Sequence, residues 1–329
     1  MASGDSSSSP GRRGSSGPAN SNTRLAIVLT LVVWAAFLLG LAGRWWWIAD
    51  LFAHFRVQYA ALLWVCAAVL FWRRERTFAM VALTGAVLLS ATVFWYVSWP
   101  APAEQAAGDL RFISFNKYWR NNDAARIAGY LEKSGADVIA VQETEAHGAV
   151  QDLARLLPSY PHLYATSGVR LGGAIFSRWP IISAETVTLV PGGANAIRAV
   201  VDVSGEQVTL VGVHLNWPIG ARNVRLRNAE LRVLAQLARR TQGPLLIIGD
   251  FNVTPWSANF YGALDDTQMR DCARGQGLAV TWPTQFAPVA IRIDQCLCSS
   301  QWEVVSVSRG PNLGSDHYPT VTDLILKEG

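Results

Sequence analysis

Eight polar side chains stand at the ends of short apolar runs after residue 109 of this 329-residue chain. They are Asn116, Glu143, His214, Asp250, Asn252, Asp294, Asp316 and His317. Each of them alone has an ordinary structural explanation, because Asx residues often make turns after strands. Turns explain the whole set poorly, so we predict that these side chains share one site.

The residue types in this set suit metal-assisted hydrolysis. Carboxylate and amide oxygens are hard ligands that suit Mg²⁺ or Mn²⁺, and an imidazole can activate a water molecule. The sequence has no Cys/His set at zinc-finger spacing, no GxxxxGK[ST] phosphate loop and no GxSxG motif. We therefore predict water-driven hydrolysis of a phosphate ester, with the metal polarising the phosphoryl oxygens.

Short apolar runs predict the strands that position these side chains. The nine predicted strands are 110–115, 138–141, 173–176, 197–203, 208–213, 245–248, 293–297, 304–307 and 321–326. Helices are predicted over 124–133, 149–156 and 223–240. Many strands with a few interspersed helices favour an α/β fold of two packed sheets that are covered by helices.

The motifs in this region resemble those of the endonuclease/exonuclease/phosphatase superfamily. Gln142-Glu143, Gly249-Asp250-Phe251-Asn252, Arg292-Ile293-Asp294 and Ser315-Asp316-His317 occur in the family's order, together with Asn116 and His214. The stretch 174–181 is also similar to the family. The resemblance covers 109–329 and implies a four-layer α/β/β/α sandwich with the site at one edge of its two sheets.

The same resemblance implies a metal site. Glu143 would be the principal ligand of Mg²⁺ (or Mn²⁺), with Asn116 and Asp316 close to the metal. The sequence departs from the family's usual pattern at Gln295-Cys296, which bears on packing more than on catalysis because Asp294 is retained.

Catalytic roles are implied for the other side chains. His317 would be the general base or a phosphate contact, and Asp294 would orient its imidazole. Asp250 and Asn252 would position the attacking water and the phosphate oxygens. His214 would stabilise or protonate the leaving oxygen.

The apolar residues are concentrated before this domain. Hydrophobic residues make up 50% of the chain and charged residues 16%, below the roughly 25% charged residues of typical soluble domains. Three uncharged runs, 25–43, 57–72 and 77–99, approach or exceed the ~20 residues that a membrane-spanning helix needs. We predict a three-helix transmembrane anchor over 23–99. A disordered Ser/Gly/Pro-rich segment (1–22) precedes it, and a Pro/Ala linker (100–108) follows it.

The distribution of arginines predicts how the anchor is oriented. Residues 73–76 hold three positive charges, and the segment before the first span holds three more. The positive-inside rule then places the N-terminus and the 73–76 loop in the cytoplasm. Three crossings of the cell membrane leave the catalytic domain on the extracytoplasmic side, tethered close to the lipid surface.

An anchor of this kind favours a membrane lipid as substrate. Three spans before such a domain resemble a bacterial branch of the family that includes membrane-anchored teicoplanin-resistance proteins of the VanJ type. That branch implies an antibiotic-resistance phosphatase that acts on undecaprenyl pyrophosphate.

Three alternatives stay open: an extracytoplasmic nuclease, a phospholipid phosphodiesterase and a non-enzymatic scaffold. Residues 104–329 carry a net charge of −1, which argues weakly against nucleic acid. Six arginines cluster over 221–240, where they are expected to form a solvated face that could also meet anionic headgroups. The sequence predicts no oligomeric state.

The four cysteines allow one disulfide in the outer domain. Cys296 and Cys298 share a strand face and are not expected to bond to each other. Cys272 could pair with either of them if the compartment is oxidising.

Overall fold

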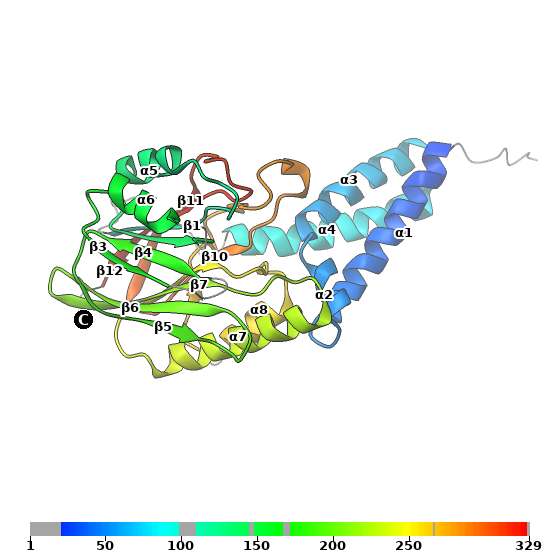
Figure 1. Cartoon of the computed structure of the whole chain (residues 1–329). Helices are drawn as coiled ribbons and strands as arrows, with labels where there is room; N and C mark the ends of the chain where they lie inside the picture. Colours follow the sequence, from blue (N-terminus) through cyan, green and yellow to red (C-terminus); the bar gives the residue numbers. More distant parts are fainter. Residues whose placement is uncertain (1–20, 99–109, 145–147, 167–171, 266, 328–329) are drawn as a thin grey trace, which may run out of the picture.

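The chain folds into a helical part and a two-sheet part (Figure 1). The computed structural model describes residues 21–98, 110–144, 148–166, 172–265 and 267–327. The predicted linker and residues 1–20 of the predicted disordered segment lie outside these ranges.

The first sheet has six strands in the order β11-β12-β1-β2-β4-β3. Their bounds are β1 (Leu110–Asn116), β2 (Val138–Gln142), β3 (His162–Ala165), β4 (Gly173–Ser177), β11 (Trp302–Arg309) and β12 (Thr320–Leu326). The central strands β1 and β2 are parallel, and the other neighbours are antiparallel. Side chains of a strand alternate between the two faces, so Phe112 packs in the core with the other sheet while Ile113 and Phe115 pack on the opposite side.

The second sheet repeats this plan with the order β5-β6-β7-β8-β10-β9. Its strands are β5 (Ile181–Thr188), β6 (Asn195–Val203), β7 (Glu206–His214), β8 (Leu245–Asp250), β9 (Arg270–Asp271) and β10 (Asp294–Cys298). Here β7 and β8 form the parallel central pair. Each sheet therefore has one parallel pair whose carboxyl ends can carry functional side chains.

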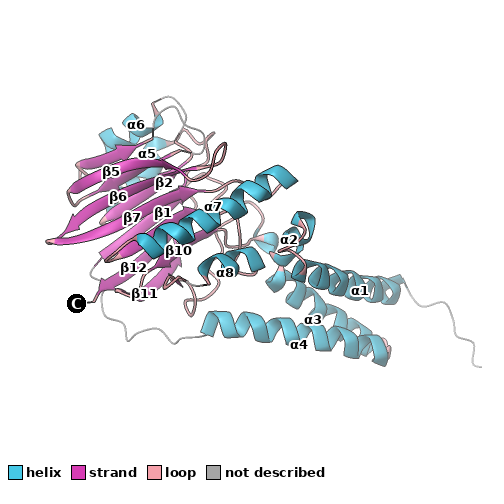
Figure 2. Ribbon diagram, turned by 90° about the horizontal axis from the view of Figure 1, so that it is seen from below, coloured by secondary structure: helices cyan, strands magenta, loops and turns pink. Residues whose placement is uncertain are grey.

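Helices cover the outer faces of both sheets. Helices α5 (Ala124–Lys133) and α6 (Ala149–Leu156) pack on the first sheet, and α7 (Ala221–Arg240) and α8 (Ala258–Leu264) pack on the second. Figure 2 shows α7 lying across the strands of the second sheet. A third apolar core fills the space between the sheets. The predicted four-layer α/β/β/α sandwich is confirmed.

The sequence prediction omitted three strands and one helix of this sandwich, as well as the 3-10 helix Ala287–Val289. β3 and β5 are edge strands whose residues are mostly half-buried or exposed, so they lack a continuous apolar run. β9 has only two residues, and α8 has seven. The predicted helix 223–240 begins two residues earlier, at Ala221. Most predicted strands extend by one to four residues, and the predicted strand 293–297 is shifted by one residue to Asp294–Cys298.

Four helices precede the sandwich: α1 (Ser21–Leu41), α2 (Trp47–Ala53), α3 (Arg56–Trp72) and α4 (Arg76–Ser98). Two of them, α1 and α4, are long and apolar enough to cross a membrane. The short helix α2 and α3 meet at a 62° bend and make a third span if they count as one. The first helix begins at Ser21, so the predicted disordered segment ends too late at residue 22. The sequence prediction also missed α2, because a seven-residue helix falls below the length of a span.

A buried ion pair joins the helical part to the sandwich. The Asp50 carboxylate on α2 accepts a 2.5 Å hydrogen bond from Nη2 of Arg227 on α7 and a 2.6 Å bond from the Ser257 hydroxyl. Both charged side chains are at most 1% exposed. Nearby, Nδ1 of His54 lies 2.9 Å from Oγ1 of Thr254. Charges this deeply buried need such partners, so α2 is docked specifically.

A second polar cluster joins α4 to the loop regions around β9 and β10. The Tyr96 hydroxyl donates a 2.5 Å hydrogen bond to Oδ2 of Asp271. Arg292 contacts both the Tyr96 hydroxyl and the Asp271 carboxylate. The backbone N–H of Gly275 donates to the Tyr96 carbonyl at 3.0 Å. The end of α4 is thereby fixed against the sandwich.

Cys272 and Cys296 form a disulfide, with their Cα atoms 5.4 Å apart. This resolves the two alternatives for Cys272, while Cys66 and Cys298 are free and buried. The bond links the residue after β9 to β10 and lies in the core between the sheets.

Removal of this disulfide is expected to destabilise the sandwich. For a 24-residue separation, loop-closure entropy predicts a loss of about 3.5 kcal/mol in the free energy of unfolding after Cys272→Ser/Cys296→Ser. Chemical unfolding measures this loss. Alkylation of the unreduced, denatured chain should label two cysteines, and labelling of all four would contradict the bond.

Candidate active site

Two parallel strand pairs bring the predicted site residues to one edge of the sandwich. Asn116 ends β1, and Glu143 directly follows β2 in the first sheet. In the second sheet His214 ends β7 and lies in register with Asp250, which ends β8. Parallel strands end at the same edge of a sheet, so the facing sheets place these four side chains together.

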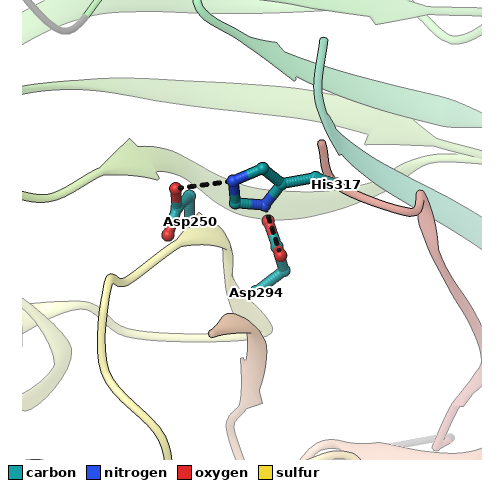
Figure 3. A group of neighbouring side chains, drawn as sticks. All are labelled: Asp250, Asp294 and His317. Carbon is teal, nitrogen blue, oxygen red and sulfur yellow. Dashed lines mark hydrogen bonds and ion pairs between the residues drawn. The ribbon is translucent and has the colours of Figure 1, made fainter. Parts of the chain in front are cut away.

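A histidine lies between two carboxylates at the centre of this edge (Figure 3). Nδ1 of His317 is 2.9 Å from Oδ2 of Asp294, and Nε2 is 3.8 Å from Oδ2 of Asp250. Asp294 begins β10 in register with Asp250. The 2.9 Å contact is a hydrogen bond that orients the ring, whereas 3.8 Å is too long for one. Nε2 is therefore the ring nitrogen without a short carboxylate contact.

The Asn116 amide connects the two sheets. Its Nδ2 donates to Oε1 of Glu143 at 2.9 Å and to Oδ2 of Asp250 at 3.1 Å. Nε2 of His214 lies 3.6 Å from the same Asp250 oxygen and 3.9 Å from Oε1 of Glu143. The backbone N–H of Trp119 donates to the other Glu143 oxygen at 2.7 Å. The Glu143 backbone has a φ of 59°, a left-handed conformation that is strained for a residue other than glycine.

The turn after β8 depends on Gly249. This residue has a φ of 145°, and a Cβ placed on it would lie 1.9 Å from the Val213 carbonyl oxygen. Only glycine allows β7 and β8 to approach this closely at the site. The backbone N–H of Asn252 then donates to Oδ1 of Asp250 at 2.8 Å and closes the turn.

We therefore expect Gly249→Ala to destabilise the protein strongly. Backbone overlap of this kind is expected to cost about 3 kcal/mol of unfolding free energy. The matched control is Gly129→Ala on α5, where a Cβ meets nothing within 4 Å and where alanine should stabilise the helix by up to about 1 kcal/mol. Equal melting temperatures for the two variants would contradict this account of the turn.

Two predicted side chains lie beside the network and contact other groups. The Asn252 amide donates to the Leu215 carbonyl at 2.9 Å. The Asp316 carboxylate accepts from Nε1 of Trp282 at 3.2 Å and from the Ser315 hydroxyl at 3.4 Å. The structure thus joins Asn116, Glu143, His214, Asp250, Asp294 and His317 in one network, and Asn252 and Asp316 flank it.

The charges in the network are not balanced by lysine or arginine. Among the described residues, the ion pairs of Glu143, Asp250 and Asp294 are all with histidines. Ligand atoms of Asp250, Asp294 and His317 lie within 4.8 Å of one another. This excess of hard, buried oxygen donors fits a divalent cation. Because the Asp294 contact occupies Nδ1 of His317, the oxygens of Glu143 and Asp250 are better placed to hold it, whereas the Asn116 oxygen accepts a 3.0 Å hydrogen bond from the Tyr118 backbone N–H.

The network shifts the pKa values of its central groups. Burial raises the pKa of Asp250 from 3.8 to about 7, although His317 opposes this shift. Burial lowers the pKa of His317, but the carboxylates of Asp294, Asp250 and Asp316 outweigh it and raise the value from 6.5 to about 10. The metal-free site therefore holds protons at neutral pH.

These shifts predict how Mg²⁺ and pH act together on stability. Folding raises both pKa values, so the folded metal-free protein holds these two protons to higher pH than the unfolded chain does. The protein therefore loses stability as the pH rises from 3.8 to about 7, where Asp250 titrates. It loses more between pH 6.5 and about 10, where His317 titrates. A cation no longer competes with these protons at high pH, so Mg²⁺ should raise the melting temperature more at about pH 9 than at about pH 6. Thermal unfolding with Mg²⁺ or EDTA measures this, and an equal rise at both values would contradict a shared site.

Sequence reasoning missed three residues that support the site. The Trp119 backbone N–H donates to the Glu143 carboxylate, and the Trp282 indole donates to the Asp316 carboxylate. Single tryptophans in loops form no sequence motif that would reveal these contacts. Arg227 is fully buried, and its Nη1 donates to the Asn252 carbonyl at 3.1 Å. The prediction that all six arginines of α7 form a solvated face is therefore wrong for Arg227. The sequence did hold a sign that Arg227 is buried. It lies three residues after Val224 and four before Leu231, and this spacing puts it on the apolar face of the helix.

Comparisons with known proteins agree with this geometry. A model of the Endonuclease/Exonuclease/phosphatase family matches residues 108–317. A structure of an endonuclease/exonuclease/phosphatase from Beutenbergia cavernae is 23% identical with a TM-score of 0.56, over 67% of this chain and 72% of that one. A humanised D. rerio TDP2 is 19% identical with a TM-score of 0.55, over 65% of this chain and 98% of that one.

A mannosyl-6-phosphatase from Bacteroides thetaiotaomicron also has this fold. It is 18% identical with a TM-score of 0.54, over 66% of this chain and 100% of that one. A search of curated proteins found no match. The family match begins just before β1 and ends at His317, so it contains every residue of the network. The chain therefore belongs to the endonuclease/exonuclease/phosphatase family of metal-dependent phosphoester hydrolases.

Proposed function

We propose that this protein is a membrane-anchored, Mg²⁺-dependent phosphohydrolase that releases phosphate from a lipid pyrophosphate such as undecaprenyl pyrophosphate. The observation that carries the proposal is the short path from the site to the anchor. Asp250 and Asn252 belong to the site, and Thr254 and Ser257 of the same segment contact His54 and Asp50 of the helical part. A site this close to the anchor suits a substrate that is itself held in the bilayer.

Exposed aromatic side chains around the site support a lipid substrate. Trp119, Trp217 and Phe286 are each more than half exposed. Trp119 follows β1, Trp217 follows β7, and Phe286 lies in the loop before β10. Tryptophan rings favour the headgroup level of a bilayer, so these loops are suited to contact its surface.

The proposed roles of the site residues follow from their contacts. His317 is oriented by Asp294 and presents Nε2 to the attacking water as general base. Glu143 would be the principal ligand of Mg²⁺ (or Mn²⁺), with Asp250, Asn116 and Asp316 close to it, and the metal would polarise the phosphoryl oxygens when bound. His214 faces the shared oxygens of Glu143 and Asp250 and stabilises or protonates the leaving oxygen. Asp250 and Asn252 position the water and the phosphate.

Two independent features support an extracytoplasmic location. The arginine-rich 73–76 loop favours a cytoplasmic position, and three spans then put the sandwich outside. The Cys272–Cys296 disulfide also suits an oxidising compartment. An alkaline phosphatase domain fused after residue 329 should be active in cells, and an inactive fusion at normal protein levels would contradict this orientation.

A nuclease is the second candidate. One neighbour with this fold is a D. rerio TDP2 complexed with a single-strand DNA product, at 19% identity. In a nuclease, the DNA phosphates would have to be bound by the five exposed arginines on α7, at positions 222, 225, 232, 239 and 240. Such binding weakens steeply with salt, so salt dependence separates the two functions.

The deciding experiment compares two substrates. Detergent-purified protein with Mg²⁺ is given undecaprenyl pyrophosphate in one assay and supercoiled plasmid DNA in the other. We expect phosphate release from the lipid, its loss with EDTA and with His317→Ala, and no DNA nicking above the level of that variant. DNA nicking without phosphate release would overturn the proposal.

A further inference from the structure

An apolar cavity of about 590 Å³ lies between the helical part and the sandwich. Its size is within the range of about 300–1,000 Å³ that is typical of ligand pockets. One wall is the segment Pro255–Ala258, which follows the site residue Asn252 by only three residues. Three residues of extended chain span at most about 11 Å, so this wall belongs to the immediate surroundings of the active site.

The opposite walls are faces of two candidate membrane-spanning helices. On α4 the lining residues Leu88, Ala91, Thr92 and Trp95 recur at helical spacing, and on α1 the lining residues Phe37, Gly40 and Leu41 do the same. Leu41, Leu88 and Trp95 are also 44–57% exposed, so they lie where the cavity opens to the surroundings of the helices. The cavity is therefore bordered by side chains that would face lipid, which gives a hydrocarbon chain a lateral route from the bilayer.

The cavity has polar groups where the helical part meets the sandwich. Of the described residues that line it, Arg56 alone is charged, and its guanidinium carbon lies 5.1 Å from the ring centre of Trp256. Among the described residues, Arg56 forms no ion pair with a carboxylate. The Tyr261 hydroxyl is buried at the same cavity without a hydrogen-bond partner. Leaving the buried Tyr261 hydroxyl unpaired is costly unless a ligand satisfies it.

We propose that this cavity binds the hydrocarbon chain of the lipid substrate, with Arg56 and Tyr261 binding the phosphate group next to the chain. This inference rests on the proposed function and adds a site for the part of the substrate that does not react. The apolar faces of α1 and α4 bury the chain, and the cation and the phenol receive the anionic end. The segment 250–258 connects the Arg56–Trp256 contact at this end of the cavity to Asp250 of the active site.

Substitutions that fill the cavity test the proposal. Ala91→Trp fills it from α4, and Ala258→Leu fills it from the sandwich, so a folding defect in one leaves the other informative. The matched control is Ala68→Trp on α3, because Ala68 is also exposed and does not line the cavity. Near-ultraviolet circular dichroism and the melting temperature establish that each variant is folded.

The first measurement is the ratio of kcat/KM for undecaprenyl pyrophosphate to kcat/KM for geranyl pyrophosphate, which has a much shorter chain. Losing the burial of about two CH₂ groups corresponds to about a tenfold change in affinity. We expect Ala91→Trp and Ala258→Leu to lower the ratio about tenfold or more, and Ala68→Trp to leave it at the wild-type value. A wild-type ratio in both cavity variants would overturn the proposal.

The second measurement requires no turnover. A polyisoprenyl phosphate with a photoreactive diazirine on its chain is irradiated with the His317→Ala protein, and labelled peptides are identified by mass spectrometry. We expect labels on 37–41 and 88–95, competed by unlabelled polyisoprenyl phosphate and not by phosphatidylglycerol. Competition by phosphatidylglycerol would assign the cavity to bulk lipid and overturn the proposal. Labelling without hydrolysis of any lipid pyrophosphate by the wild type would refute the proposed reaction and leave the cavity as a lipid site.

Discussion

Replacing His317 with alanine is expected to lower the rate of hydrolysis about 10³-fold, because a positioned general base contributes roughly 10²–10⁴-fold. The imidazole is buried, it is hydrogen-bonded to Asp294 through Nδ1, and its Nε2 faces Asp250 at 3.8 Å. The measurement is kcat for phosphate release at saturating Mg²⁺. The control is His162→Ala, since His162 lies on the edge strand β3, outside the network. A His317→Ala variant that keeps more than a tenth of the activity would contradict the assignment.

Asp294→Asn tests whether Asp294 acts through this ring. If His317 is the base, activity rises as the pH passes through its pKa, and the Asp294 carboxylate is among the groups that raise this pKa. Its removal should move the acidic limb of the pH–rate profile to lower pH and reduce kcat by about 10²-fold or more, because the ring also loses its orientation. A purely structural role would lower kcat without moving the limb.

The clustering of six of the predicted side chains could be foreseen because several of them lie at strand ends. Asn116, His214 and Asp250 each end a run of buried apolar residues, and the two facing parallel pairs put those ends at one edge. The motif Gly249-Asp250-Phe251-Asn252 was also recognisable in the sequence. Its glycine is required because the Val213 carbonyl oxygen approaches closely. Which atoms meet could not be predicted. The Asn116 amide that bridges Glu143 and Asp250 depends on how the two sheets face each other.

The docking of the helical part was not predictable from patterns. Asp50 lies in a seven-residue helix within a region that resembles a loop between spans, and Arg227 lies among five exposed arginines. Hydropathy reports that a segment can enter a bilayer, but it does not report which polar residue of a connection pairs with a distant helix. The edge strands β3 and β5 were missed for a related reason, because their partly exposed residues show no regular alternation of apolar and polar side chains.

Breaking the Asp50–Arg227 pair should both destabilise the protein and reduce its activity. Removing one partner of a buried ion pair leaves the other charge unpaired and costs about 3–5 kcal/mol. Arg227 also donates to the Asn252 carbonyl at 3.1 Å, so its displacement would loosen the turn that carries Asp250. We expect Asp50→Leu to lower the free energy of unfolding by this amount and to reduce kcat. Chemical unfolding and phosphate release measure the two effects.

The double variant Asp50→Leu/Arg227→Met separates charge from shape. It removes both charges together, and replacing a buried pair by apolar residues of similar volume is often neutral for stability. We therefore expect stability to recover, whereas kcat stays low because methionine cannot donate to the Asn252 carbonyl. Asp152→Ala is the control, since the exposed Asp152–Arg155 pair on α6 should contribute about 0.5 kcal/mol or less. If Asp50→Leu unfolds like this control, α2 is not docked through Arg227. If the double variant regains full activity, the contact with Asn252 does not position the catalytic turn.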